Sequence, residues 1–246
     1  MKKIIKLCLV VLLIAAVPVS GCARQSAKGE TNKDNKWKED KVVPPKKKRP
    51  EPVFSMREIC EGDEVYQRII GRSYKENDEI ALENLRYLTI SYYGFDEETH
   101  QGEMIVNKDV AQKVLAIFEK LYAARYPIER MELVDEFDAD DTKSMEANNT
   151  SAFNYRKIAN SNQLSNHSYG RAIDINPLYN PYVYQYNGKL YVEPEAGRTY
   201  ADRSKEFPHK IQKNDFCYRI FTEYGFTWGG DFQKRKDYQH FEIGNP

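Results

Sequence analysis

Apolar residues three or four positions apart predict two amphipathic helices in this chain of 246 residues. The first begins after Asn107, a residue type that caps helices, and ends before Pro127. Its apolar positions are Val110, Val114, Ile117, Phe118 and Leu121. The second runs over residues 214–224 and ends at Gly225, because glycine commonly follows the last turn of a helix. Its apolar positions are Phe216, Ile220, Phe221 and Tyr224.

Alternation of apolar and polar residues predicts short strands elsewhere in the chain. It is found over residues 131–134, 171–176 and 237–243. The charged segment 54–86 indicates short helices or turns. The sequence contains no fixed-period repeat and no glycine-rich phosphate-binding motif. This order of elements favours an α+β fold, with a small antiparallel sheet and flanking helices.

The first 21 residues have the pattern of a secretory signal. Three lysines precede an apolar run over residues 7–17. As a helix this run is about 16 Å long, which is too short for a ~30 Å hydrocarbon core. A basic start, a short apolar run and small residues after it are typical of a signal peptide, so residues 1–21 are predicted to be one. The closing residues Val19-Ser20-Gly21-Cys22 resemble the bacterial lipobox, which implies a lipid anchor on Cys22. The alternative is an ordinary signal peptide with an incidental cysteine.

Residues 22–52 are expected to form a disordered basic tether. They contain ten Lys or Arg, five Asp or Glu and few apolar side chains, so they bury too little surface to offset chain entropy. We interpret the segment as a solvated spacer; contact of residues 46–49 with anionic lipid headgroups is the alternative. Together with the signal, the tether predicts an extracytoplasmic bacterial membrane lipoprotein.

The remaining residues, 53–246, are predicted to form the functional domain. They carry 24 basic and 32 acidic side chains, a net charge of −8. Such a surface is poorly suited to replacing the counterions of nucleic acid, so no nucleic-acid partner is expected. The sequence gives no sign of oligomerisation, and a monomer is the default. Cys60 and Cys217 lie in this exported domain, where either a disulfide between them or two buried thiols is possible.

Two segments hold polar residues at unusual positions. In the predicted strand 171–176, Asp174 lies between two isoleucines and faces away from the core. Gly170 allows a turn that brings His167 back beside Asp174. In the predicted strand 237–243, His240 and Glu242 share the face opposite to the apolar residues.

These segments together predict a catalytic metal centre. His167, Asp174 and His240 offer two imidazoles and one carboxylate, and three such ligands with an open fourth position suit one Zn²⁺ ion. Calcium and magnesium prefer more oxygen ligands.

The motifs resemble those of a known peptidase family. Ser165-x-His167, Asp174, Trp228-Gly229-Gly230-Asp231 and Asp237-x-x-His240 are similar to the zinc D-alanyl-D-alanine carboxypeptidases, the VanY-like branch of the LAS peptidases. Further similar segments are 102–106, 144–149, 153–156 and 176–182, so the likeness spans roughly residues 87–243. Their fold is shared with the Hedgehog signalling domain. One departure is Asp237, where many relatives have Glu, which shortens the side chain by one methylene.

The resemblance implies roles for individual residues. His167, Asp174 and His240 are implied as zinc ligands, Asp237 as the catalytic acid and base, and Arg156 as the cation that polarises the scissile carbonyl. The alternative for Arg156 is a simple ion pair with a carboxylate of residues 138–141. We expect Glu242 to orient a ligand imidazole. Residues expected to bind the substrate are Ser144, Asn148 and Ser165, and those expected to shape the pocket are Trp228 and Asp231.

The resemblance and the predicted location imply peptidoglycan stem peptides as the substrate. The family favours release of the terminal D-Ala from a D-Ala-D-Ala end. An endopeptidase that cleaves between L-Ala and D-Glu is one alternative. A non-catalytic zinc module that binds the cell wall is another, although such a module has no need for both Asp237 and Arg156.

Overall fold

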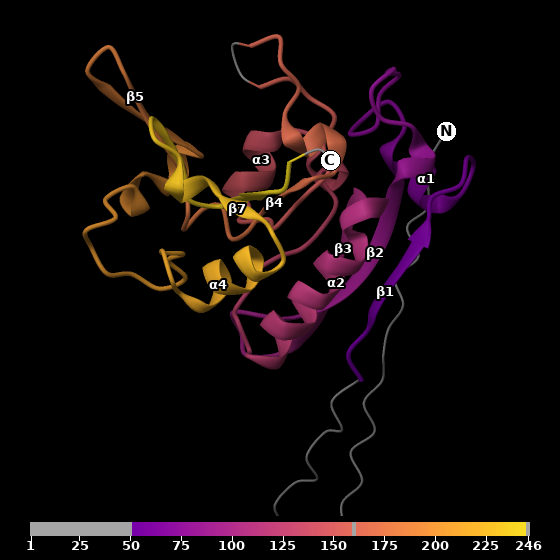
Figure 1. Cartoon of the computed structure of the whole chain (residues 1–246), viewed down its shortest axis with the longest axis horizontal. Helices are drawn as coiled ribbons and strands as arrows, with labels where there is room; N and C mark the ends of the chain where they lie inside the picture. Colours follow the sequence, from indigo (N-terminus) through magenta and orange to yellow (C-terminus); the bar gives the residue numbers. More distant parts are fainter. Residues whose placement is uncertain (1–50, 159–160, 245–246) are drawn as a thin grey trace, which may run out of the picture. The chain divides into compact units, whose positions relative to one another are not determined.

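The structure, a computed structural model, describes residues 51–158 and 161–244 (Figure 1). The predicted signal peptide, Cys22 and nearly all of the tether lie outside these residues. Within the described part, no helix combines the length and the apolar character that a membrane span requires.

An N-terminal sheet supports the long helix of the domain. Its strands β1 (Phe54–Glu58), β2 (Leu85–Tyr93) and β3 (Thr99–Asn107) are antiparallel and lie in the order β1-β2-β3. Helix α2 (Lys108–Ala123) packs against β2 and β3 (Figure 1). It begins as predicted, because the Asn107 side chain accepts a hydrogen bond from the backbone N–H of Asp109 at 3.1 Å.

The core joins both predicted helices to the C-terminal strands. Helix α4 (Phe216–Glu223) is capped by Asp215 and lies within the predicted range. Its residue Phe221 packs edge-on against Phe118 of α2 and stacks on Phe241, with ring centroids 4.1 Å apart in the second pair. All three rings are buried. Burial of such large side chains stabilises the fold by about 1.5–3 kcal/mol each, so the core holds the strand that contains Phe241 firmly in place.

Two further sheets lie in the C-terminal half of the described residues. One contains β4 (Ala172–Asp174), β9 (His240–Glu242) and β7 (Thr227–Trp228) in the order β4-β9-β7. The other contains β6 (Lys189–Glu193), β5 (Tyr182–Tyr186) and β8 (Arg235–Asp237) in the order β6-β5-β8. Every pairing is antiparallel. The predicted α+β class is confirmed, with three small sheets in place of one.

Short helices connect these strands. The α-helices are α1 (Glu64–Ile69) and α3 (Asp141–Glu146). The 3₁₀ turns are Leu82–Asn84, Val134–Phe137, Asn166–Tyr169, Glu195–Tyr200 and Gly229–Asp231.

Three sequence-based predictions about this domain are wrong. Residues 131–134 form no strand: Met131 accepts one hydrogen bond from the backbone of Glu103, and the chain then enters a 3₁₀ turn. Segment 54–86 contains strand β1 besides short helices. The sequence did not reveal this edge strand, because it is largely exposed and lacks the alternation of a half-buried strand. The two cysteines of the described residues are not bridged, since Cys60 is exposed whereas Cys217 is fully buried in α4. Burial raises the pKa of the Cys217 thiol.

Candidate metal centre

Three local structures bring the predicted ligands together. His167 lies in the 3₁₀ turn Asn166–Tyr169, and Asp174 and His240 are directly paired across β4 and β9. Gly170 ends the 3₁₀ turn with φ +64°, a conformation that glycine adopts without steric cost. A Cβ atom there would lie only 2.5 Å from the backbone nitrogen of Asn107. The turn at Gly170 therefore directs the chain so that His167 lies beside Asp174.

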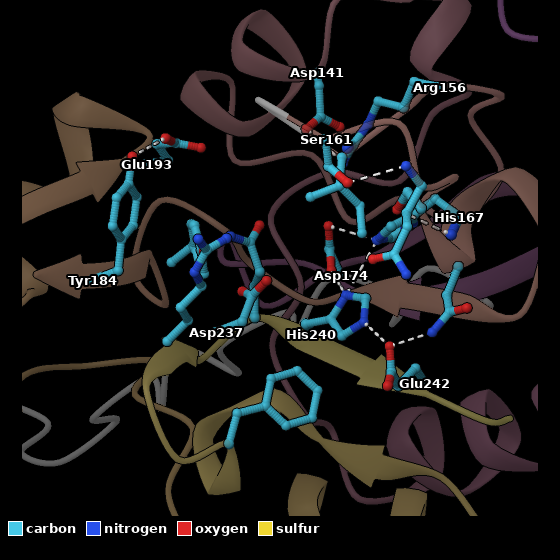
Figure 2. Close-up of a pocket in the computed structure, with 18 of the residues that line it drawn as sticks. Asp141, Arg156, Ser161, His167, Asp174, Tyr184, Glu193, Asp237, His240 and Glu242 are labelled. Atoms are coloured by element: carbon cyan, nitrogen blue, oxygen red, sulfur yellow. Dashed lines mark hydrogen bonds and ion pairs between the residues drawn. The ribbon is translucent and has the colours of Figure 1, made fainter. Parts of the chain in front are cut away.

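One donor atom from each of these residues lies within 4.8 Å of the other two, and each imidazole faces its own oxygen of Asp174. His167 Nε2 lies 3.2 Å from His240 Nδ1 and 3.3 Å from Asp174 Oδ2, and His240 Nδ1 lies 3.0 Å from Asp174 Oδ1 (Figure 2). A tetrahedron with zinc–ligand distances of about 2.0–2.1 Å has edges of roughly 3.3–3.4 Å. The three residues are 4–7% exposed. The residues therefore fit a zinc ion.

The second nitrogen of each imidazole is bound to an oxygen atom. His167 Nδ1 donates to the carbonyl of Ala152 at 2.5 Å, and His240 Nε2 donates to Glu242 Oε2 at 2.8 Å. Glu242 also accepts a hydrogen bond from Asn166 Nδ2 at 2.6 Å. These bonds fix the tautomers in which His167 Nε2 and His240 Nδ1 carry lone pairs directed at the space between the three side chains, where a cation would bind. The position of Glu242 agrees with its expected orienting role.

The electrostatics of the cluster favour positive charge at its centre. Burial would raise the pKa of Asp174, but the His167 and His240 imidazoles hold it well below its ordinary value, so the carboxylate is ionised. Burial would lower the pKa of His240, but its hydrogen bonds to Asp174 and Glu242 raise it to about 10. A proton or a metal cation at His240 Nδ1 is therefore stabilised.

Asp237 lines the same cavity as the three donors. It lies at the end of β8, and burial raises its pKa to about 7. Among the described residues, three buried side-chain polar atoms have no hydrogen-bond partner: Arg156 Nε, Asp237 Oδ1 and Gln239 Oε1. All three residues line this cavity, whose volume is about 1300 Å³. Because buried polar atoms are nearly always paired, these atoms indicate a place where a ligand binds.

Arg156 forms an ion pair and also lines the cavity. Its Nη2 atom forms an ion pair with Asp141 Oδ2 at 2.7 Å, so the structure contains the simple pairing with residues 138–141 (Figure 2). The side chain also lines the cavity, and its Nε donor is one of the atoms without a partner. The pairing with Asp141 therefore leaves part of the guanidinium available to a ligand.

Two of the three predicted substrate-binding residues lie outside the cavity. Ser144 Oγ accepts a hydrogen bond from Asn149 Nδ2 at 3.0 Å, and Asn148 binds Glu129 and the backbone of Leu178. Both are buried and their side chains bond to the surrounding loops, so the structure does not place them at this cavity as expected. Ser165 does line the cavity and accepts a hydrogen bond from the backbone of His167.

Trp228 and Asp231 were expected to shape the pocket, and they line a separate, smaller hollow instead. Trp228 Nε1 donates to the carbonyl of Tyr238 at 2.9 Å, and Asp231 forms an ion pair with Lys213. These contacts fix the chain just before and after β8.

One wall of the cavity was not expected from the sequence. It is the exposed face of the β6-β5-β8 sheet, and its residues are Tyr182, Tyr184, Tyr186, Tyr191, Glu193, Arg235 and Asp237. We refer to it as the tyrosine face. The spacing of Tyr182, Tyr184 and Tyr186 at every second position is the strand signal that would have revealed it.

Residues 159–243 match a family model described as D-alanyl-D-alanine carboxypeptidase. The match confirms the resemblance to this carboxypeptidase family over the segment that contains the three donors and Asp237. It supports a metallopeptidase. Arg156 precedes the matched segment, so only its position in the cavity lining connects it with the site. No curated protein and no solved structure matches the chain.

Proposed function

We propose that this protein is a zinc-dependent peptidase that removes the terminal D-Ala from peptidoglycan stem peptides ending in D-Ala-D-Ala. The observation that carries the proposal is the buried cluster of His167, Asp174 and His240, in which one donor atom from each residue lies within 4.8 Å of the others. The match to the carboxypeptidase family supports the reaction type and the substrate class.

Zinc would be held by His167 Nε2, a carboxylate oxygen of Asp174 and His240 Nδ1. When bound, it lowers the pKa of water from ~15.7 to about 7 and polarises a carbonyl group. The buried imidazoles and the ionised Asp174 provide the preformed site.

Asp237 is the proposed acid and base. Its carboxylate accepts a proton from the attacking water and later gives it to the amine that leaves. A general base acts best when its pKa lies near the working pH, and burial raises the pKa of Asp237 to about 7.

Arg156 is the proposed stabiliser of negative charge on the carbonyl oxygen. One donor placed in this way typically contributes roughly 3–4 kcal/mol to the stability of the transition state. Arg156 lines the cavity and its buried Nε atom has no hydrogen-bond partner, which supports this assignment.

The N-terminal sequence supports a location outside the membrane. A lipid anchor on Cys22 and a tether over residues 22–52 would place the domain near peptidoglycan. Peptidoglycan and the membrane are therefore the proposed partners.

Mass analysis of muropeptides treated with the zinc-loaded protein tests this function. Loss of one D-Ala from a pentapeptide, abolished by a chelator and by Asp237→Ala, is the expected result. Cleavage between L-Ala and D-Glu would identify an endopeptidase. Unchanged muropeptides that nevertheless bind the protein would identify a non-catalytic module and refute the proposal.

A further inference from the structure

The charges that line the cavity are mostly negative. Its carboxylates are Asp141, Asp174, Glu193, Asp237 and Glu242. Among the described residues, its two arginines are Arg156 and Arg235, and the lining includes no lysine. Away from the candidate metal centre, a negatively charged group of a ligand would therefore be repelled from most of this surface unless an arginine received it.

The two arginines differ in their partners. Arg156 already forms an ion pair with Asp141 at 2.7 Å. Arg235 forms no ion pair with any carboxylate of residues 51–158 and 161–244. Arg235 is an exposed residue of the cavity lining and has no carboxylate partner among the described residues, so its guanidinium is open to a ligand.

Aromatic contacts hold Arg235 against the tyrosine face. Its guanidinium carbon lies 5.6 Å from the ring centre of Tyr184, which in turn stacks on Tyr191 with centroids 5.0 Å apart. Burial raises the pKa of the neighbouring Tyr182 hydroxyl, and the Arg235 guanidinium acts against this effect. A guanidinium above an aromatic ring keeps its in-plane N–H groups available, so Arg235 can contact Tyr184 and still bind a carboxylate with two hydrogen bonds.

The position of Arg235 relates it to the reaction site. Arg235 and Asp237 are two residues apart on β8, so their side chains share one face about 7 Å apart along the strand. Tyr184 pairs with Arg235, and Tyr182 pairs with Asp237. In Figure 2, Asp237 lies between Tyr184 and His240. Because an extended peptide advances ~3.3–3.6 Å per residue, Arg235 lies within one or two residues of a bond held beside Asp237.

We propose that Arg235 binds a carboxylate of the peptide substrate and so sets the specificity of the site for acidic peptides. This inference rests on the proposed function. The carboxylate has two sources, the C-terminus of the peptide or an acidic residue within it, and both present the same planar group to the guanidinium.

Hydrolysis by the full-length, zinc-loaded protein and its Arg235→Gln variant tests the proposal. Three pentapeptides are compared: one with free carboxylates, one with an amidated C-terminus, and one with its internal acidic residue amidated. Loss of a charge-assisted pair predicts that Arg235→Gln lowers kcat/KM for the free peptide on the order of ten- to a hundredfold, through KM. The peptide whose amidation removes the carboxylate bound by Arg235 is expected to be cleaved at the same rate by the parent and by Arg235→Gln. That peptide shows whether the bound carboxylate is the C-terminus or the internal acidic residue.

Lys234→Gln is the matched control, because Lys234 is exposed, adjacent in sequence and absent from the cavity lining. It should leave all three kcat/KM values unchanged. Arg235→Lys should restore part of the lost KM effect, because lysine keeps the charge and loses the bidentate geometry. Equal loss on all three peptides, or no loss on any, would overturn the proposal.

Failure of the proposed function is distinguishable from failure of this inference. If the parent protein cleaves none of the peptides, calorimetric binding of the free and amidated peptides replaces the kinetic comparison. A preference for the free peptide that Arg235→Gln removes would then support the inference without the peptidase activity. Absence of both cleavage and binding would refute both.

Discussion

Asp174 and His240 lie directly opposite each other on β4 and β9, with Asp174 Oδ1 3.0 Å from His240 Nδ1. The pair belongs to a sheet whose strand β9 is held by the stacked rings of Phe221 and Phe241. Two donors of the candidate metal centre are therefore fixed by strand register, whereas His167 is positioned by a turn. Effects on metal binding can be predicted from this difference.

Glu242→Gln should weaken zinc binding about 10–100-fold without abolishing it. The carboxylate holds His240 Nε2–H at 2.8 Å and so aims Nδ1 at the cluster, and the amide is a weaker acceptor. Competition with a chromophoric chelator measures the affinity. The control is Glu223→Gln, which removes an exposed carboxylate paired with Lys120. Equal affinities for both variants and the parent would show that Glu242 has no orienting role.

Gly170→Ala should destabilise the domain more than Gly62→Ala. Both glycines have positive φ, +64° and +83°, so alanine costs about 1–2 kcal/mol of strain at either position. At Gly170 the added Cβ also meets the backbone of Asn107 at 2.5 Å, whereas nothing lies within 4 Å at Gly62.

Urea unfolding of both variants isolates the steric contribution at Gly170. Because Gly170 ends the turn that holds His167, only Gly170→Ala should also weaken zinc binding. Similar unfolding free energies for the two variants would contradict the predicted clash.

Hydrolysis should decline on the acid side as Asp237 takes up a proton. A base must be ionised, so activity is retained above the pKa of Asp237 and lost as the pH falls through it. Burial raises this pKa to about 7, and a bound dication lowers it, because positive charge stabilises the carboxylate. The acid limb of the zinc-loaded protein is therefore expected below pH 7. A pH profile of kcat/KM measures this acid limb. If the residual activity of Asp237→Asn shows the same acid limb, the titrating group is not Asp237.

Glu103→Gln should destabilise the protein by about 1–3 kcal/mol at pH 7. The Glu103 side chain is 18% exposed, and its carboxylate accepts hydrogen bonds from Arg68 and Tyr87. Burial would raise the pKa of Glu103, but Arg68 and Tyr87 lower it below its ordinary value. The stabilisation is thus present above the unfolded-state pKa of ~4.3 and disappears as the pH falls through the folded-state pKa.

Urea unfolding of Glu103→Gln at pH 7 and pH 3 compares the two states of the carboxyl group. Glu136→Gln is the control, since this second partner of Arg68 is 49% exposed and should change stability by less than about 0.5 kcal/mol. A constant difference between parent and Glu103→Gln at both pH values would contradict the ionic origin of the effect.

Local signals in the sequence were enough to predict some parts of the domain. Helix α2 follows from apolar spacing and the cap at Asn107, and the closeness of His167 to Asp174 follows from Gly170 and strand alternation. The tyrosine face depends on pairing between segments that are far apart in the chain, such as Tyr182 with Asp237, and single-strand patterns do not specify partners.

Buried polar residues are the other difficulty. Asn148 has the same residue type whether it binds a ligand or stabilises a loop, and only its contacts with Glu129 and Leu178 decide between these roles. Likewise, the presence of Cys60 and Cys217 gives no information about the distance between them. Polarity indicates that a residue has a partner without identifying it.

The proposed base and the last proposed ligand belong to different sheets. Asp237 ends β8 and His240 begins β9, with only Tyr238 and Gln239 between them. Substitutions in the β6-β5-β8 sheet can therefore alter the reach of the base while the donor set of the β4-β9-β7 sheet stays intact. Related sequences can therefore differ in catalytic rate while they keep the same affinity for the metal.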